Sequence, residues 1–94
     1  MQLLRSYKRF LISNMNHYPE LSFQTVPALW KQRSDIFKSN EIDLLDTRID
    51  SAGIAFLVQW SKALNGQKLK IKNAPDNAIN LIKTYRLTEL FETE

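Results

Sequence analysis

The chain has no cysteine, one histidine (His17), two glycines and three prolines among its 94 residues. Without cysteine it can form neither a disulfide framework nor a thiolate metal site. A single histidine leaves a histidine metal cluster or a His-dependent catalytic triad almost nothing to build on. Two distant glycines, Gly53 and Gly66, cannot make a Gly-rich phosphate loop. The composition therefore predicts no metal site, no cofactor and no catalysis by this chain alone.

Long apolar runs are also missing. The longest is the segment 54–58, far short of the roughly 20 residues that a membrane span requires. The N-terminal "MQLLRSYKRFLISN" has charges among its apolar residues, so it lacks the apolar core of a signal peptide. Hydrophobic residues make up 44% and charged residues 24%, as is ordinary for a globular protein. We expect one cytoplasmic domain over residues 1–94 with no direct membrane insertion.

The formal net charge is +3, and such a basic domain can attract nucleic acid or anionic lipid. Most of the lysines and arginines are scattered. The exception is Lys68, Lys70 and Lys72, which alternate with two apolar residues as on a strand with one solvated face. A nucleic-acid-binding domain with salt-sensitive affinity stays an alternative. The scatter favours a protein that binds no nucleic acid.

The pattern of helix and strand signals is clearest in the second half of the chain. Strands are predicted at 41–47 and 67–72, with helices at 25–38, 51–64 and 76–85 and a last helical turn at 87–91. Asn65-Gly66 should end the second helix. The segment 4–14 predicts one or two strands, and His17 a solvated loop. Strands alternating with helices at these spacings indicate an α/β unit with a right-handed crossover between parallel strands.

The predicted helix at 51–64 is apolar on most of its circumference. Ile54, Leu57 and Val58 form a core-facing stripe, whereas Phe56 and Trp60 fall largely on the other side. Either another helix of this domain covers the second face, or a second protein does. Trp30 poses the same choice, because tryptophan is common both in cores and at interfaces.

The residues that begin this helix are Asp50-Ser51-Ala52-Gly53. Asp50 or Ser51 can cap the free backbone amides of the first turn. The small side chains would equally leave room for another protein to dock. A serine at this place is also a possible phosphate acceptor, since phosphate is favoured at the positive end of a helix.

Three segments together resemble the core of the STAS domain family: "IDLLDT", "RIDSAGIAFLVQW" and "GQKLKIKNAPDNAINLIKTYRLTELF". The resemblance covers residues 41–91. Upstream, "ELSFQTVPALWKQR" is similar to the MlaB group of that family, the cytoplasmic STAS subunits of the Mla phospholipid-transport ABC complexes of Gram-negative bacteria. The implied fold is a single α/β domain over 1–94, with a small mixed β-sheet and helices packed mainly on one face.

The resemblance also implies a function. A subunit of this group binds, stabilises and activates the ATPase of its transporter, which maintains the lipid asymmetry of the outer membrane. Through the ATPase it meets the permease and the periplasmic lipid-binding subunit, so it lies at the cytoplasmic side of the inner membrane. By position, Trp30 and Ser51 would face the ATPase, with Ala52 and Ala55 beside them. The alternative within the same fold is an anti-sigma-factor antagonist that a kinase switches by phosphorylating Ser51.

Overall fold

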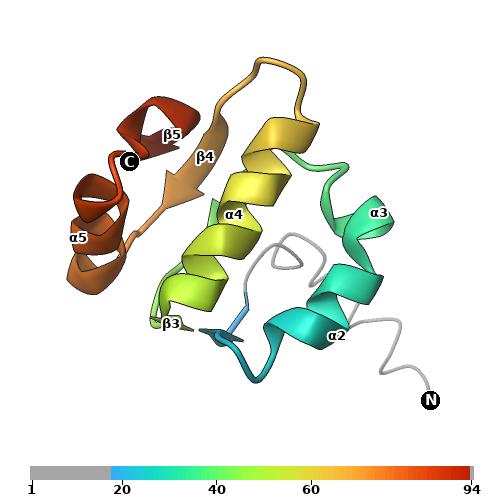
Figure 1. Cartoon of the computed structure of the whole chain (residues 1–94), viewed down its shortest axis with the longest axis horizontal. Helices are drawn as coiled ribbons and strands as arrows, with labels where there is room; N and C mark the ends of the chain where they lie inside the picture. The colour runs from blue at the N-terminus through green and yellow to red at the C-terminus, as the bar shows by residue number, and fades with distance from the viewer. Residues whose placement is uncertain (1–17, 94) are drawn as a thin grey trace.

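A computed structural model of the chain describes residues 18–93. The strands expected within 4–14 and the loop expected around His17 lie outside these residues. The described part is an α/β arrangement in which short strands alternate with helices, as the sequence predicted (Figure 1).

The strands form two small parallel sheets. One sheet has the order β2-β4-β5, and the other pairs β1 with β3. Every strand pair within 18–93 is parallel, so the expected mixed sheet has no antiparallel pair there. The bounds are β1 Glu20–Leu21, β2 Glu41–Asp43, β3 Arg48–Ile49, β4 Leu69–Lys72 and β5 Phe91–Thr93.

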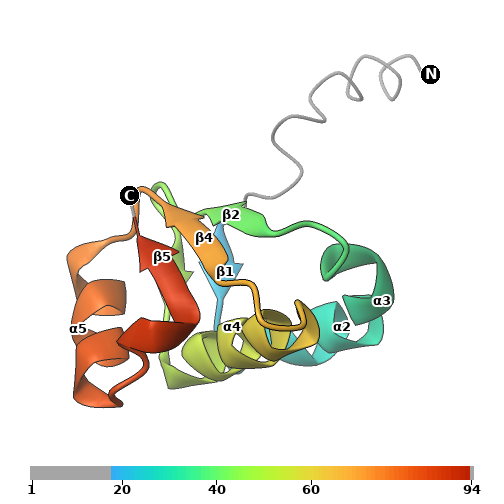
Figure 2. The ribbon, with the colours of Figure 1, turned by 90° about the horizontal axis from the view of Figure 1, so that it is seen from above.

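The helices α2, α3 and α4 lie on one side of the strands, as Figure 2 shows. The longest is α4, whose span agrees with the predicted helix at 51–64 to within one residue. It ends where Asn65 and Gly66 adopt left-handed backbone conformations, with φ of 51° and 94°. The bounds are α2 Val26–Lys31, α3 Arg33–Ile36, α4 Ser51–Ala63, α5 Asp76–Thr84 and the 3-10 turn η2 Thr88–Leu90.

Three predicted elements are shorter than expected, and one of them, the strand predicted at 67–72, begins only at Leu69. The strand predicted at 41–47 ends at Asp43, because the chain turns through Asp46, which has a left-handed φ of 57°. The helical turn predicted at 87–91 stops at Leu90. Phe91 instead begins β5, where it pairs with Leu69 of β4 and is buried.

The helix predicted at 25–38 is broken at Gln32. The backbone of Gln32 leaves helical geometry, with φ of −102° and ψ of 11°, so α2 ends there and α3 begins. Arg33 therefore starts a new helix, and its side chain is exposed. After the break, Phe37 reaches over α4.

Phe37 covers the second apolar face of α4. Its ring stacks on Trp60 with centroids 5.6 Å apart and leans on Phe56 at 5.5 Å. Phe56 and Trp60 are 2% and 0% exposed, and the Trp60 indole donates a 2.8 Å hydrogen bond to the Ser39 carbonyl. The chain itself covers this face, so these two side chains belong to the core.

The rest of the core lies between α4, α5 and the strands. Strand residues alternate strictly in β4, where Leu69 and Ile71 are fully buried and the lysines between them point the other way. Lys70 lies opposite Glu41 in the parallel register, and Lys72 forms a 3.4 Å ion pair with Glu41. Acidic side chains of β2 thus lie beside the lysines of β4.

Candidate partner-binding surface

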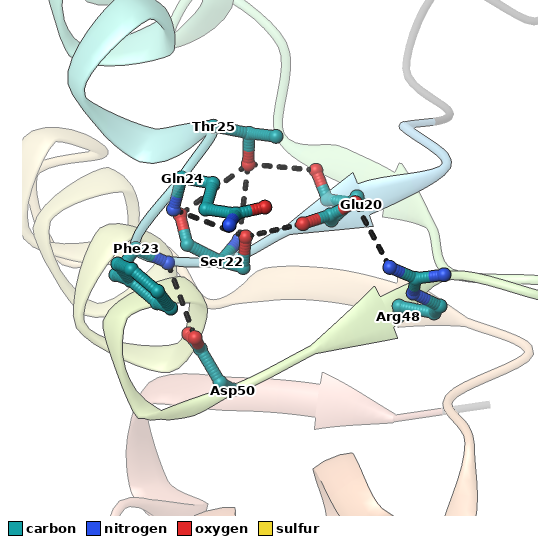
Figure 3. A network of polar contacts seen from close by, with 7 residues as sticks. All are labelled: Glu20, Ser22, Phe23, Gln24, Thr25, Arg48 and Asp50. Atoms are coloured by element: carbon teal, nitrogen blue, oxygen red, sulfur yellow. Dashed lines mark hydrogen bonds and ion pairs between the residues drawn. The ribbon is translucent and has the colours of Figure 1, made fainter.

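Asp50 caps α4. Its Oδ1 accepts hydrogen bonds from the amides of Ala52 (2.9 Å) and Gly53 (3.1 Å), two of the amides that a helix start leaves without a partner. Its Oδ2 accepts a third, from the amide of Phe23 at 3.1 Å (Figure 3). Capping is therefore the work of Asp50. Ser51, the first helical residue, is exposed, and its hydroxyl has no hydrogen-bond partner within residues 18–93.

A second group of polar contacts holds the loop between β1 and α2 (Figure 3). The Ser22 hydroxyl donates to Glu20 at 2.6 Å, and the Thr25 hydroxyl donates to the Glu20 carbonyl at 3.0 Å. Arg48 of β3 approaches Glu20 at 3.4 Å. Together with the Phe23–Asp50 bond, these contacts fix the loop against the start of α4. The side chain of Phe23 is 69% exposed, and its backbone amide is bonded to Asp50, the residue before Ser51.

The carboxyl of Asp50 is biased towards its ionised form. Burial raises the pKa of this carboxyl, but hydrogen bonds from the amides of Phe23, Gly53 and Ala52 outweigh that cause and hold the pKa below its usual value. A lowered native pKa means that ionised Asp50 stabilises the fold above its unfolded-state pKa. That contribution is lost as the pH falls through the native pKa.

Replacing Asp50 by alanine should lower the free energy of unfolding by about 1–2 kcal/mol at neutral pH, because the cap and the tie to the loop are both lost. Urea unfolding followed by circular dichroism measures this. Asp50→Asn is the matched control, since it keeps one carbonyl oxygen and should lose less. The difference between wild type and Asp50→Asn should shrink in acid. A difference that grows in acid would contradict the assigned role of the charge.

Beyond its cap, α4 presents one exposed stripe that runs its whole length. We call it the α4 stripe; its members are spaced by three, four or one residues and are all exposed. Its first two side chains are small, the next two are long and polar, and the last is again small. The members are Ser51, Ala55, Gln59, Lys62 and Ala63.

The N-terminal half of the stripe borders a hollow of about 280 Å³, here the Tyr85 groove. Its far wall is the turn after α5, where Tyr85 is 52% exposed. No charged side chain from residues 18–93 lines it. The lining residues are Ser51, Ile54, Ala55, Val58, Gln59, Tyr85 and Leu87.

The C-terminal half borders a wider hollow of about 500 Å³, here the Trp30 groove. Its far wall is formed by residues of α2 and α3 and by Phe37, which follows α3. Figure 1 shows these two helices beside α4. Gln59 lines both hollows, so they are neighbours along α4. The lining residues are Trp30, Arg33, Ser34, Phe37, Gln59, Lys62 and Ala63.

The sequence-predicted site residues are thus placed on one side of α4, although not in one cluster. Ser51 and Ala55 share the Tyr85 groove, and Ala52 beside them is half-buried. Trp30 lies in the neighbouring groove and is 38% exposed. A larger hollow of about 580 Å³, between β1 and α2, contains none of the predicted residues.

Sequence reasoning missed Phe23 and Tyr85 as surface residues. Phe23 lies in the loop before α2, outside every predicted element, and Tyr85, the last residue of the helix predicted at 76–85, lies just past the end of α5. The available signal was their type and place. A large aromatic side chain in a loop or at a helix end has few neighbours to cover it.

Within residues 18–93, no three histidine or acidic side chains gather in a way that would hold a metal ion. No helix in this part of the chain is long and apolar enough to cross a bilayer. Comparisons with models of protein families, with curated proteins and with solved structures found no match.

Proposed function

We propose that this chain is a STAS-like, non-catalytic regulatory subunit. In this proposal it binds, stabilises and activates the ATPase of an ABC transporter that moves phospholipids to maintain outer-membrane lipid asymmetry. The ATPase would link it to the permease and the periplasmic lipid-binding subunit. The resemblance of residues 41–91 and of "ELSFQTVPALWKQR" supplies the identity of the partner.

The observation that supports a docking role is the form of the surface around the start of α4. Asp50 accepts the hydrogen bonds of the free backbone amides at the start of α4, so Ser51 is not needed as the cap. Ser51 and Ala55 have small, exposed side chains. The exposed Tyr85 lines the same hollow as these two residues, and the backbone amide of Phe23, a second exposed aromatic residue, is bonded to Asp50 beside Ser51. Small residues beside an exposed aromatic one let a partner backbone approach closely and bury apolar area, as interface centres do.

Ser51→Arg should weaken binding to the ATPase at least tenfold while leaving the fold intact, because a long charged side chain would fill the Tyr85 groove. Co-purification of the tagged chain with the ATPase and permease from the same genome tests this, followed by an affinity measurement on the purified pair. Trp30→Ala should also weaken binding more than it weakens folding.

Asn80→Arg is the matched control. Asn80 is exposed on α5 and lines neither groove, so the same charge is added away from the proposed surface. If Ser51→Arg and Asn80→Arg bind the ATPase equally well, the surface is assigned wrongly. If the folded wild type never retains a soluble ATPase, the transporter role itself fails.

The second candidate function is an anti-sigma-factor antagonist, and the exposure of the Ser51 hydroxyl is the observation that favours it. Phosphate on Ser51 would lie beside the positive end of α4. The same purification separates the two functions. A chain that retains no ATPase but carries phosphate on Ser51, by mass spectrometry of the protein from its own cells, supports the antagonist.

A further inference from the structure

The Trp30 groove has a rigid aromatic floor. The edge of Trp30 meets Phe37 with ring centroids 6.2 Å apart, and Phe37 is itself stacked on the buried Trp60. The row of rings thus continues into the core, where the hydrogen bond from the Trp60 indole to the Ser39 carbonyl holds Trp60 in place. Such a preformed apolar floor costs little ordering entropy when a partner side chain enters.

Two cations flank this floor from opposite sides. Arg33 places its guanidinium 4.2 Å from the Trp30 ring centre and donates a 2.9 Å hydrogen bond to the Trp30 carbonyl. Lys62 comes from α4 on the other wall. Neither forms an ion pair within residues 18–93, and no acidic residue there lines the groove. Nearby Asp35 is turned to Lys38, at 3.5 Å.

We infer that the Trp30 groove receives a segment of the partner ATPase that carries a carboxylate next to an apolar side chain. The identity of the partner rests on the proposed function, whereas the chemistry of the segment rests on the groove. The apolar side chain would lie on Trp30 and Phe37, and the carboxylate would accept from Arg33, Lys62 or both. Arg33 suits this role, since its guanidinium is already oriented by Trp30.

The contrast with the Tyr85 groove predicts where along the partner segment its negative charge lies. Among the described residues, the Tyr85 groove has no charged lining and the Trp30 groove has two cations, yet Gln59 belongs to both. A segment lying along the α4 stripe would therefore be neutral near Ser51 and acidic near Lys62. Two cations on a small aromatic hollow suit a single carboxylate better than a phosphate backbone, which needs a row of cations.

The experiment pairs two double variants. Arg33→Glu with Lys62→Glu reverses the groove cations, and Lys68→Glu with Lys83→Glu makes the same change in net charge at exposed lysines outside it. Affinity for the purified ATPase is measured at low and high salt. We expect the groove variant to lose at least tenfold in affinity and most of the salt dependence, and the control to stay within about threefold of wild type. Equal affinities of the two variants would overturn the inference while leaving the proposed function intact.

A second arm does not depend on the ATPase. A short synthetic helical peptide with glutamate and leucine one turn apart is titrated into the labelled chain, and the indole N–H resonance of Trp30 is followed by NMR. The peptide with glutamine in place of glutamate is the control. A shift with the acidic peptide alone supports the inference even if no ATPase binds, and no shift overturns it. A DNA duplex or phosphatidylglycerol vesicles that shift this resonance as strongly would also overturn it.

Discussion

Trp60→Ala should lower the free energy of unfolding by about 3–5 kcal/mol, the largest loss expected from any single truncation described above. Trp60 is 0% exposed, stacks on Phe37 and meets Phe56 edge to face at 6.3 Å. Its removal would empty the centre of the aromatic cluster and take away the ring on which Phe37 stacks. Equilibrium unfolding in urea, followed by far-ultraviolet circular dichroism, gives the loss directly.

Two companion variants separate the causes. Trp60→Phe keeps most of the ring but removes the donor to the Ser39 carbonyl, so it should cost about 1–2 kcal/mol. Trp30→Ala removes a side chain that is 38% exposed and should cost about 1 kcal/mol. If Trp60→Ala were no more destabilising than Trp30→Ala, the second face of α4 would not be covered as described.

Gly53→Ala should cost about 3 kcal/mol in the free energy of unfolding. A Cβ at this position would collide with the carbonyl oxygen of Leu21 and lie 2.7 Å from a side-chain carbon of Ile49. The obstacle is the backbone of β1, which cannot move without also disturbing its ladder with β3. Alanine is the better helix former by about 1 kcal/mol, and that gain is too small to offset the collision.

Gly66→Ala is the matched control for this prediction. At Gly66, by contrast, an added Cβ would have no neighbour within 4 Å among residues 18–93, but the φ of +94° strains any other residue, so a loss of only about 1 kcal/mol is expected. Thermal unfolding of both variants beside the wild type ranks them. A Gly53→Ala protein as stable as wild type would mean that α4 does not pack directly on β1.

Local signals were sufficient to predict α4. Asp50 before a run of apolar residues indicated its start, and Asn65-Gly66 indicated its end, because capping and left-handed termination depend on neighbouring residues only. The alternating "LKIK" indicated β4 for the same reason. These elements agree with the structure because their local preference and their burial point to the same conformation.

Elements that depend on distant contacts were predicted less well. The break at Gln32 separates two stretches with good helical patterns, and it follows from how Phe37 packs on α4. Phe91 belongs to a strand because Leu69 is beside it in space. Likewise, composition could not decide whether this chain or a partner covers Phe56 and Trp60, since only the packed structure shows Phe37 above them.

For the candidate surface, the sequence indicated the place but not its shape. The motif 50–53 pointed to the start of α4, and Ser51 and Ala55 are indeed exposed there. What it could not provide is the separation of Trp30 from Ser51 into adjoining grooves, or the exposed rings of Phe23 and Tyr85. Those depend on the relative placement of α2, α4 and α5.

The parallel ladders have a consequence for how the chain reaches its fold. No two successive strands within 18–93 form a hairpin; Glu41 pairs with Lys70, Leu69 with Phe91 and Glu20 with Arg48, each across at least one intervening helix. Each ladder must therefore close a long loop before any of its hydrogen bonds form. Such topologies have high contact order and fold slowly compared with helical bundles of similar size. Local opening should be cooperative for the same reason. If β1 separates from β3, the close packing of Gly53 against Leu21 and the hydrogen bond from Phe23 to Asp50 at the start of α4 are lost as well.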